Sequence, residues 1–222
     1  MSMKILDSAK PKGNIFQLLF ATAIIEIGLM ISSFGTALFY AASLGSSPMA
    51  TFSDGIHNLL SISYGTANMV MNILLLIVLF FLERKHINIG TVLCVFTIGP
   101  WVNIFNALLQ GLNIAEMNLA IRILCTVLGT VLMGTGLGLY VAVDRGFGAL
   151  EGLVKVLCER AGMSTSKAKI LQDIILVAGG VLLGATWGIG TVIAIVFTGP
   201  LLNQSIKIFS GRVLKQLQHP QN

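Results

Sequence analysis

The chain of 222 residues is 55% hydrophobic and only 10% charged, and its mean hydropathy is +0.87. This composition excludes an ordinary soluble domain and indicates a protein that lies in a lipid bilayer. The formal net charge of +5 does not indicate a nucleic acid partner, because the basic residues are dispersed among the ends of apolar stretches.

Six apolar stretches are each long enough to cross about 30 Å of hydrocarbon, which takes roughly 20 residues. They cover residues 15–41, 65–82, 88–109, 118–143, 168–186 and 188–208. The first stretch follows a short basic leader at residues 1–14, but it is too long for a signal peptide and lacks a clear cleavage site. We therefore expect an uncleaved spanning helix there.

Two shorter segments lie between these stretches: "SSPMATFSDGIHNLLSIS" after the first and "FGALEGLVKVLCERAGMS" after the fourth. Each offers roughly a dozen helical residues, too few to cross a bilayer comfortably. Both are expected to be short helices, either re-entrant and lining a site, or interfacial and lying on the membrane surface. The first segment carries Asp54 and His57 and the second carries Glu151.

The sequence repeats itself at a spacing of 100 residues. "INIGTVLCVFTIGPWVN" at residues 87–103 corresponds to "WGIGTVIAIVFTGPLLN" at residues 187–203. Further matches at this spacing are Tyr40 with Tyr140, and Asn72 with Gln172. The chain is therefore predicted to contain two copies of one unit, residues 15–112 and 113–210, followed by a tail at residues 211–222.

The basic residues predict how the chain crosses the membrane. If neither short segment spans and the amino terminus is cytoplasmic, every Lys and Arg except Arg122 falls on the cytoplasmic side. If both segments crossed, Arg84, Lys85 and Arg145 would lie outside, against the positive-inside rule. We therefore predict an all-α protein with six spanning helices and both termini cytoplasmic. Three spans in each copy make the two copies inverted, a plan that recurs in secondary transporters.

Each copy carries a Gly-Pro pair near the middle of its third spanning helix and an Asn three residues after the proline. A proline in a helix interior costs about 3 kcal/mol. The pattern predicts two broken helices, each restarting with free N–H groups directed at the bilayer centre, where a polar or anionic solute could bind. The alternative is two kinked helices in close packing. The candidate substrate-binding residues are Gly99, Pro100, Asn103, Gly199, Pro200 and Asn203, with Asp54 and His57 from the first short segment.

Charged residues inside the apolar stretches form another set of candidates. Glu26 lies in the middle of a stretch, where an ionised carboxylate is costly unless it is paired or protonated, so it is the candidate residue for proton coupling. Asp173 lies nearer a helix end, where it can reach the headgroups. Arg122 is expected to extend outward toward Glu116. An ion pair between Glu26 and Arg122 would instead give Glu26 a structural role.

The sequence offers no enzyme motif. Cys94, Cys125 and Cys158 are scattered without metal-ligand spacing, and no nucleophile-base pattern or phosphate-binding loop is visible, so neither a metal, a cofactor nor an enzyme is expected. The glycine-rich run "LGTVLMGTGLGLY" lies inside an apolar stretch and is interpreted as a helix-packing face.

The stretches "FYAASLGSSPMATFSDGI", "SYGTANMVMNILLL" and "NIGTVLCVFTIGPWVN" resemble the YczE/YyaS/YitT-type family of bacterial multi-pass membrane proteins. The resemblance covers roughly residues 15–208. It implies a bacterial plasma membrane protein of transporter type, without indicating a substrate.

Taken with the repeat, these features favour a secondary transporter or facilitator for a polar or anionic small molecule, bound at mid-membrane between the two Gly-Pro breaks. Two alternatives stay open: the substrate-binding subunit of an energy-coupling vitamin importer, and a non-transporting membrane scaffold or assembly factor. The expected partners are the solute, the lipid bilayer, and either a second copy of the chain or importer subunits.

Overall fold

The computed structural model describes residues 15–82, 89–143, 148–163 and 165–218. Within these ranges the chain is helical and contains no strand, so the predicted all-α class is confirmed. The elements are α1 (Ile15–Ala42), α2 (Pro48–Leu60), α3 (Tyr64–Leu82), α4 (Ile89–Gln110), the 3-10 helix η3 (Ile114–Glu116), α5 (Leu119–Ala142), α6 (Ala149–Ala161), α7 (Thr165–Leu182) and α8 (Ile189–Gln218).

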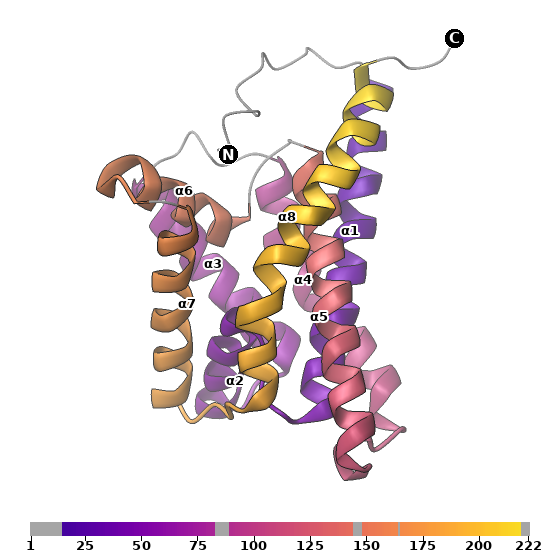
Figure 1. Cartoon of the computed structure of the whole chain (residues 1–222), viewed down its shortest axis with the longest axis vertical. Coiled ribbons are helices and arrows are strands. Elements are labelled where there is room, and N and C mark those ends of the chain that lie inside the picture. The colour runs from indigo at the N-terminus through magenta and orange to yellow at the C-terminus, as the bar shows by residue number, and fades with distance from the viewer. Residues whose placement is uncertain (1–14, 83–88, 144–147, 164, 219–222) are drawn as a thin grey trace.

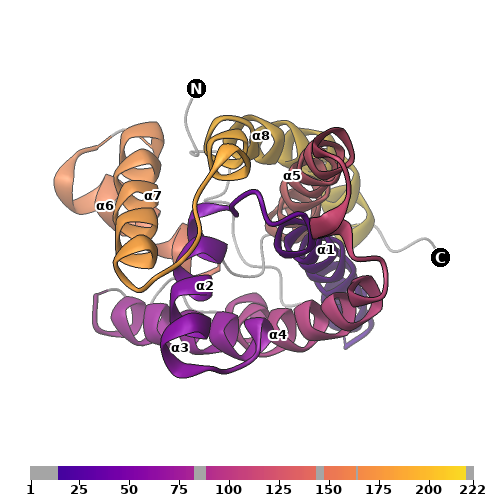
Figure 2. The same cartoon turned by 90° about the horizontal axis from the view of Figure 1, so that it is seen from below.

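The long helices α1, α4, α5 and α8 form one side of the molecule (Figures 1 and 2). There α1 packs between α4 and α5, and α5 packs between α1 and α8, so α4 and α8 lie on opposite sides of the α1–α5 pair. The second side contains α2, α3, α6 and α7. Helix α3 joins the two sides because it packs along α4, whereas α7 packs along α2 and α6 and not along α8.

Glycines bring α1 and α5 into backbone contact. A Cβ atom built on Gly28 would lie 2.7 Å from the carbonyl oxygen of Gly136, and one on Gly35 would lie 2.6 Å from that of Gly129. In lipid there is no hydrophobic driving force that brings helices together. Close backbone packing at small residues is therefore a usual way to hold two helices together in a membrane. The prediction that the glycine-rich run is a packing face is confirmed.

Five of the described helices are long and apolar enough to cross a membrane, namely α1, α3, α4, α5 and α8. The chain is therefore a multi-pass membrane protein. Helix α7, predicted as a sixth span at residues 168–186, covers Thr165–Leu182 and is less apolar because Lys167, Lys169 and Asp173 lie in its first half. Helix α8 continues to Gln218, so most of the predicted tail at residues 211–222 is helical.

The predicted Gly-Pro breaks are absent, which corrects the sequence analysis. Helix α4 continues through Pro100, and α8 continues through Pro200. Both prolines are exposed on the surface of the bundle, so their rings face outward and the remaining backbone hydrogen bonds carry each helix past them. No restarted helix end faces the interior at these positions, and α4 and α8 do not pack together. The proposed solute site between two broken helices is therefore wrong.

The short helices α2 and α6 supply the interior helix ends instead. Helix α2 begins at the buried residues Ser47 and Pro48 and ends at the exposed Ser61. Helix α6 likewise begins at the buried Gly148 and Ala149 and is exposed at its other end. Each short helix thus directs its amino terminus, the positive end of its dipole, into the protein.

Candidate functional site

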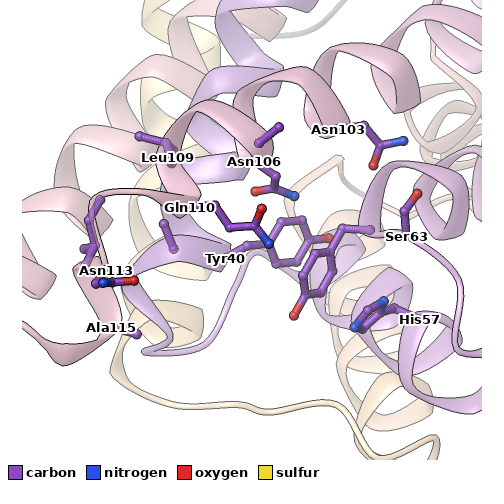
Figure 3. Close-up of a pocket in the computed structure, with 13 residues that line it drawn as sticks. Tyr40, His57, Ser63, Asn103, Asn106, Leu109, Gln110, Asn113 and Ala115 are labelled. Atoms are coloured by element: carbon purple, nitrogen blue, oxygen red, sulfur yellow. The ribbon is translucent and has the colours of Figure 1, made fainter.

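A cavity of about 600 Å³ opens between the ends of α1, α2 and α4, at the end of the bundle opposite the carboxyl end of α8 (Figures 1 and 3). Its size lies within the range of small-molecule sites. Polar side chains make up much of the lining although the helices that carry them are apolar. They are Tyr40, His57, Ser63, Tyr64, Asn103, Asn106, Gln110 and Asn113.

Three stacked rings form one wall of the cavity. The Tyr64 ring lies 4.2 Å from the Tyr40 ring and 3.9 Å from the His57 ring, measured between centroids. Nδ1 of His57 contacts the carbonyl oxygen of Ile62, which can only accept a hydrogen bond, so Nδ1 carries a proton. The Tyr40 hydroxyl donates to the carbonyl oxygen of Ala50 at 3.2 Å, which ties the wall to the first turn of α2.

Carboxamides from one stripe of α4 and the turn after it form the opposite wall (Figure 3). Asn103, Asn106, Gln110 and Asn113 are spaced at about one helical turn and therefore face the same side. Oδ1 of Asn103 accepts the backbone N–H of Gly65 at 2.9 Å. Nδ2 of Asn106 is buried and donates to no group of the described residues.

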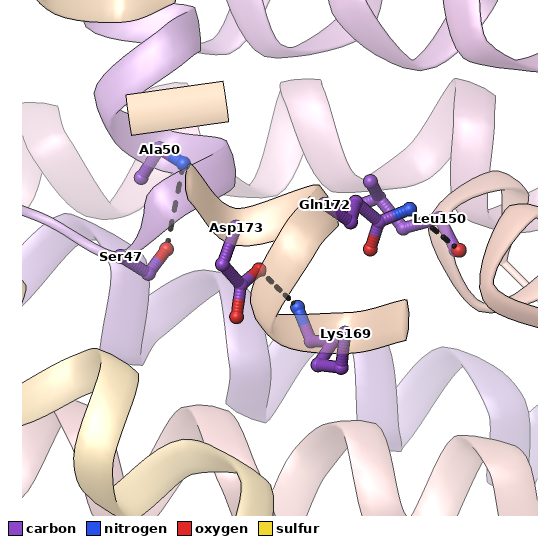
Figure 4. A network of polar contacts seen from close by, with 6 residues as sticks. All are labelled: Ser47, Ala50, Leu150, Lys169, Gln172 and Asp173. Atoms are coloured by element: carbon purple, nitrogen blue, oxygen red, sulfur yellow. Dashed lines mark hydrogen bonds and ion pairs between the residues drawn. The ribbon is translucent and has the colours of Figure 1, made fainter. Parts of the chain in front are cut away.

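Polar pairs occupy matching places in α3 and α7. In α3, Nδ2 of Asn72 donates to Oδ1 of Asn68 at 2.8 Å, and both side chains are buried. In α7, Nζ of Lys169 lies 2.5 Å from Oδ1 of Asp173 (Figure 4). Each pair occupies the fifth and ninth residues of its helix. The structural partner of Asn72 is therefore Asp173, and its sequence match with Gln172 is one residue out of register.

Gln172 links α7 to the start of α6. Its Nε2 donates to the carbonyl oxygen of Leu150 at 3.0 Å, close to the buried amino terminus of α6 (Figure 4). At the other short helix, Oγ of Ser47 caps α2 by accepting the backbone N–H of Ala50 at 3.4 Å. These bonds hold both short helices with their amino termini buried.

The candidates predicted from the sequence are only partly brought together. Asn103 and His57 line the cavity, and Gly99 is buried against Gly65 beside it. Asp54 lies outside the lining, where its Oδ2 accepts the backbone N–H and the hydroxyl of Thr186 at 3.0 and 3.3 Å. These bonds tie α2 to the loop that precedes α8.

The matching candidates in the second half lie elsewhere. Pro200 and Asn203 are exposed, and a Cβ atom built on Gly199 would meet no atom within 4 Å. Pro100 is exposed and does not line the cavity. Among the described residues of the second half, Gly199, Pro200 and Asn203 therefore do not form a wall of the kind that Asn103 helps to form in the first half.

The two charged candidates of the apolar stretches are not paired with each other. Oε2 of Glu26 accepts from Nε1 of Trp101 at 3.4 Å, and its Oε1 is buried without a partner among the described residues. The Arg122 guanidinium donates to the carbonyl oxygens of Ala42 and Ser43, both at 2.8 Å. Arg122 thus caps the carboxyl end of α1 and does not bind Glu116.

Several cavity residues were missed by the sequence analysis: Tyr40, Ser63, Tyr64, Asn106, Gln110 and Asn113. The signal that could have found most of them is a run of carboxamides at helical spacing that starts inside an apolar stretch. In the described ranges, no group of three or more His, Cys, Asp or Glu residues is arranged to hold a metal ion.

Comparison with known proteins places the chain in a family. Residues 19–207 match the model described as a family of unknown function, DUF6198. The chain belongs to the DUF6198 family. No solved structure matches it.

Three bacterial relatives resemble this DUF6198 chain along most of its length. The uncharacterized membrane protein YczE of Bacillus subtilis is 25% identical over 194 residues, which cover 85% of this chain and 88% of YczE. An uncharacterized protein of Haemophilus influenzae is 25% identical and covers 85% of this chain and 84% of its own length. The uncharacterized protein YyaS of Bacillus subtilis is 21% identical, and the match covers 86% of this chain and 94% of YyaS. The resemblance to the YczE/YyaS-type family is confirmed.

Proposed function

We propose that this DUF6198 protein is a small secondary transporter or facilitator that carries a polar small molecule across the bacterial plasma membrane. The solute binds in the cavity between the three-ring wall of Tyr40, His57 and Tyr64 and the carboxamides of α4. An open cavity of about 600 Å³ at one end of an apolar bundle, with eight polar side chains among its lining residues, is the observation that carries this proposal. Nδ2 of Asn106 is buried without a partner among the described residues, and a desolvated donor is costly unless it is bonded.

The order of the helices supports alternation between two states. Each half contains a long helix, a helix of 13 residues and two more long helices, and the short helices lie toward opposite ends of the bundle (Figure 1). We infer that the halves are inverted repeats, with six spans that include α7, and that both termini are cytoplasmic. The cavity then opens to the outside.

In any one state of an inverted-repeat transporter, the two halves are expected to adopt different arrangements. The two halves of this chain differ in how the second long helix packs against the third. In the first half α3 is closed on α4, because Gly65 and Gly99 lie backbone to backbone and Asn103 bonds to Gly65. In the second half α7 does not pack along α8, and Gly199 is free of contacts. We infer that transport exchanges these arrangements.

Uptake by the purified chain in proteoliposomes tests this function. A panel of polar metabolites is first screened for an increase in the thermal unfolding temperature, and each compound that gives one is then supplied in radiolabelled form. We expect uptake that is lost in Asn103→Leu and kept in Asn203→Leu, the matched exposed residue. A stabilising compound that never crosses the membrane would contradict transport and favour a binding subunit.

A further inference from the structure

The chemistry of the cavity lining narrows the class of solute. Among the described lining residues there is no Asp, Glu, Lys or Arg. An ion that leaves water for a bundle of apolar helices needs a countercharge or several strong hydrogen bonds. The lining therefore offers little to a charged solute and favours an uncharged one.

The carboxamides define what an uncharged solute must carry. The acceptor of Asn103 is occupied by the N–H of Gly65, so its Nδ2 is the group left to face a ligand. Nδ2 of Asn106 is buried, donates to no described group, and belongs to a side chain that lines the cavity (Figure 3). Both groups are donors, and they call for an acceptor such as a carbonyl oxygen.

The ring wall supplies the complementary acceptor and a flat surface. Because Nδ1 of His57 donates to the carbonyl oxygen of Ile62, Nε2 is the acceptor in the tautomer whose single proton lies on Nδ1. Tyr64 is stacked between Tyr40 and His57, so a planar molecule can extend the stack on the outer face of one of these two rings.

We propose that the cavity selects uncharged planar heterocycles or aromatic amides that carry a carbonyl group and an N–H group, the chemistry shared by nucleobases and nicotinamide. The carbonyl oxygen accepts from the amides of Asn103 and Asn106, and the N–H donates to Nε2 at the edge of the His57 ring. This inference rests on the proposed function for its biological role, but the binding chemistry is independent of transport.

Equilibrium binding to the full-length chain in nanodiscs, without any gradient across the membrane, tests the proposed class of ligand. The probes are nicotinamide and nicotinate, which share a ring and differ in a neutral amide against a carboxylate, and uracil and orotate, which share a ring and differ in a hydrogen against a carboxylate at C6. We expect nicotinamide and uracil to bind at least tenfold more tightly than their anionic counterparts. Anions that bind as well as the neutral probes, or neutral probes that do not bind, would overturn the inference.

Two variants connect the binding to the cavity. Asn106→Leu keeps the shape of the side chain and removes its donor, so it should weaken nicotinamide binding at least tenfold. Asn203→Leu makes the same change at an exposed residue of α8 and should leave the affinity unchanged. Equal affinity in wild type and Asn106→Leu would contradict the site. Tight binding of the neutral probes without their uptake in proteoliposomes would support the inferred class of ligand and contradict transport. Failure of the inference and failure of the proposed function can therefore be distinguished.

Discussion

The backbone N–H of Gly65 donates to Oδ1 of Asn103 at 2.9 Å, at the point where Gly65 also touches the backbone of Gly99. One hydrogen bond and one close backbone contact thus close the seam between α3 and α4. The corresponding residues of the second half, Gly199 and Asn203, lie on an open face of α8. The same substitution should therefore have different effects in the two halves.

Replacing the glycine of each Gly-Pro pair by alanine should change stability in opposite directions in the two halves. A Cβ atom on Gly99 would lie 2.6 Å from the carbonyl oxygen of Gly65, so α3 and α4 must separate, at a typical overpacking cost of about 1–3 kcal/mol. Gly199 has free space in a helix, where alanine is favoured by about 1 kcal/mol. We expect Gly99→Ala to lower and Gly199→Ala to raise the unfolding temperature in detergent. A shift of the same sign in both would argue against the asymmetric seams.

Asn103 should contribute to stability as well as to the cavity. Gly65 is the second residue of α3, so its N–H has no acceptor within the helix and depends on Oδ1 of Asn103. Asn103→Leu leaves this buried N–H unpaired, at a cost of about 1–3 kcal/mol. Asn203→Leu, on an exposed face, should stay within about 0.5 kcal/mol of wild type. Chemical unfolding measures the free energy of unfolding of both variants. Equal free energies would show that the hydrogen bond between Asn103 and Gly65 is weak.

Arg122 should be difficult to replace. Its guanidinium donates to the carbonyl oxygens of Ala42, the last residue of α1, and of Ser43, which have no partner within the helix. Arg122→Gln removes the charge and most of the donors, and should cost about 1–3 kcal/mol. Arg122→Lys keeps a charge but not the planar arrangement of donors, so its stability should fall between that of the wild type and that of Arg122→Gln. If Lys and Gln behave alike, geometry rather than charge governs this cap.

Glu151 should make stability depend on pH. It lies in α6, outside the spanning helices, where burial raises the pKa of its carboxyl group, Lys169 lowers it and Asp173 raises it. A carboxyl whose pKa is higher in the folded state ionises more readily when unfolded, so its contribution falls as pH rises above the ordinary value of 4.5. Glu151→Gln should therefore raise the unfolding temperature at about pH 8 and have little effect below pH 4.5. An increase of equal size at both pH values would exclude ionisation as the cause.

The helices were predictable because length and apolarity determine a membrane span almost alone. The ends of α1, α3, α4 and α5 fall within one residue of their predicted ranges. The exceptions are α7, where polar residues at one end obscure the boundary, and α8, which continues to Gln218 beyond its predicted end at residue 208. The sequence repeat placed α7 with an offset of 100, whereas α3 and α7 begin 101 residues apart. The short helices α2 and α6 are also 101 residues apart at both ends, whereas α1 and α5 end 100 residues apart, so the extra residue lies before the short helix.

The candidate site was harder to predict, because it depends on which side of each helix faces inward. Pro100 marks a position where a backbone bond is lost, and the structure turns that position outward. Asn103 lies almost one turn further and faces α3 instead. Tyr40 and Tyr64 are far apart in the sequence, and their stacking follows from the turn between α2 and α3, which sequence pattern alone does not specify.

The account requires that the open seam between α7 and α8 can close, and cysteine cross-linking tests this directly. In the closed seam, the Cβ atom of Met69 lies 3.1 Å from a Cβ atom built on Gly99. Ile170, the sixth residue of α7 as Met69 is of α3, is the matching partner for Gly199. The pair Ile170→Cys and Gly199→Cys is made in a chain whose Cys94, Cys125 and Cys158 are replaced by Ala.

Oxidation of this double variant in membrane vesicles should give an intramolecular disulfide, since closure brings the two Cβ atoms near the roughly 4 Å that a disulfide needs. The same disulfide should stop uptake of any transported solute, and a reductant should restore it. Each single cysteine variant serves as the control. A pair that stays reduced although both thiols react with a small alkylating agent would show that the seam does not close, and would contradict alternation between the two halves.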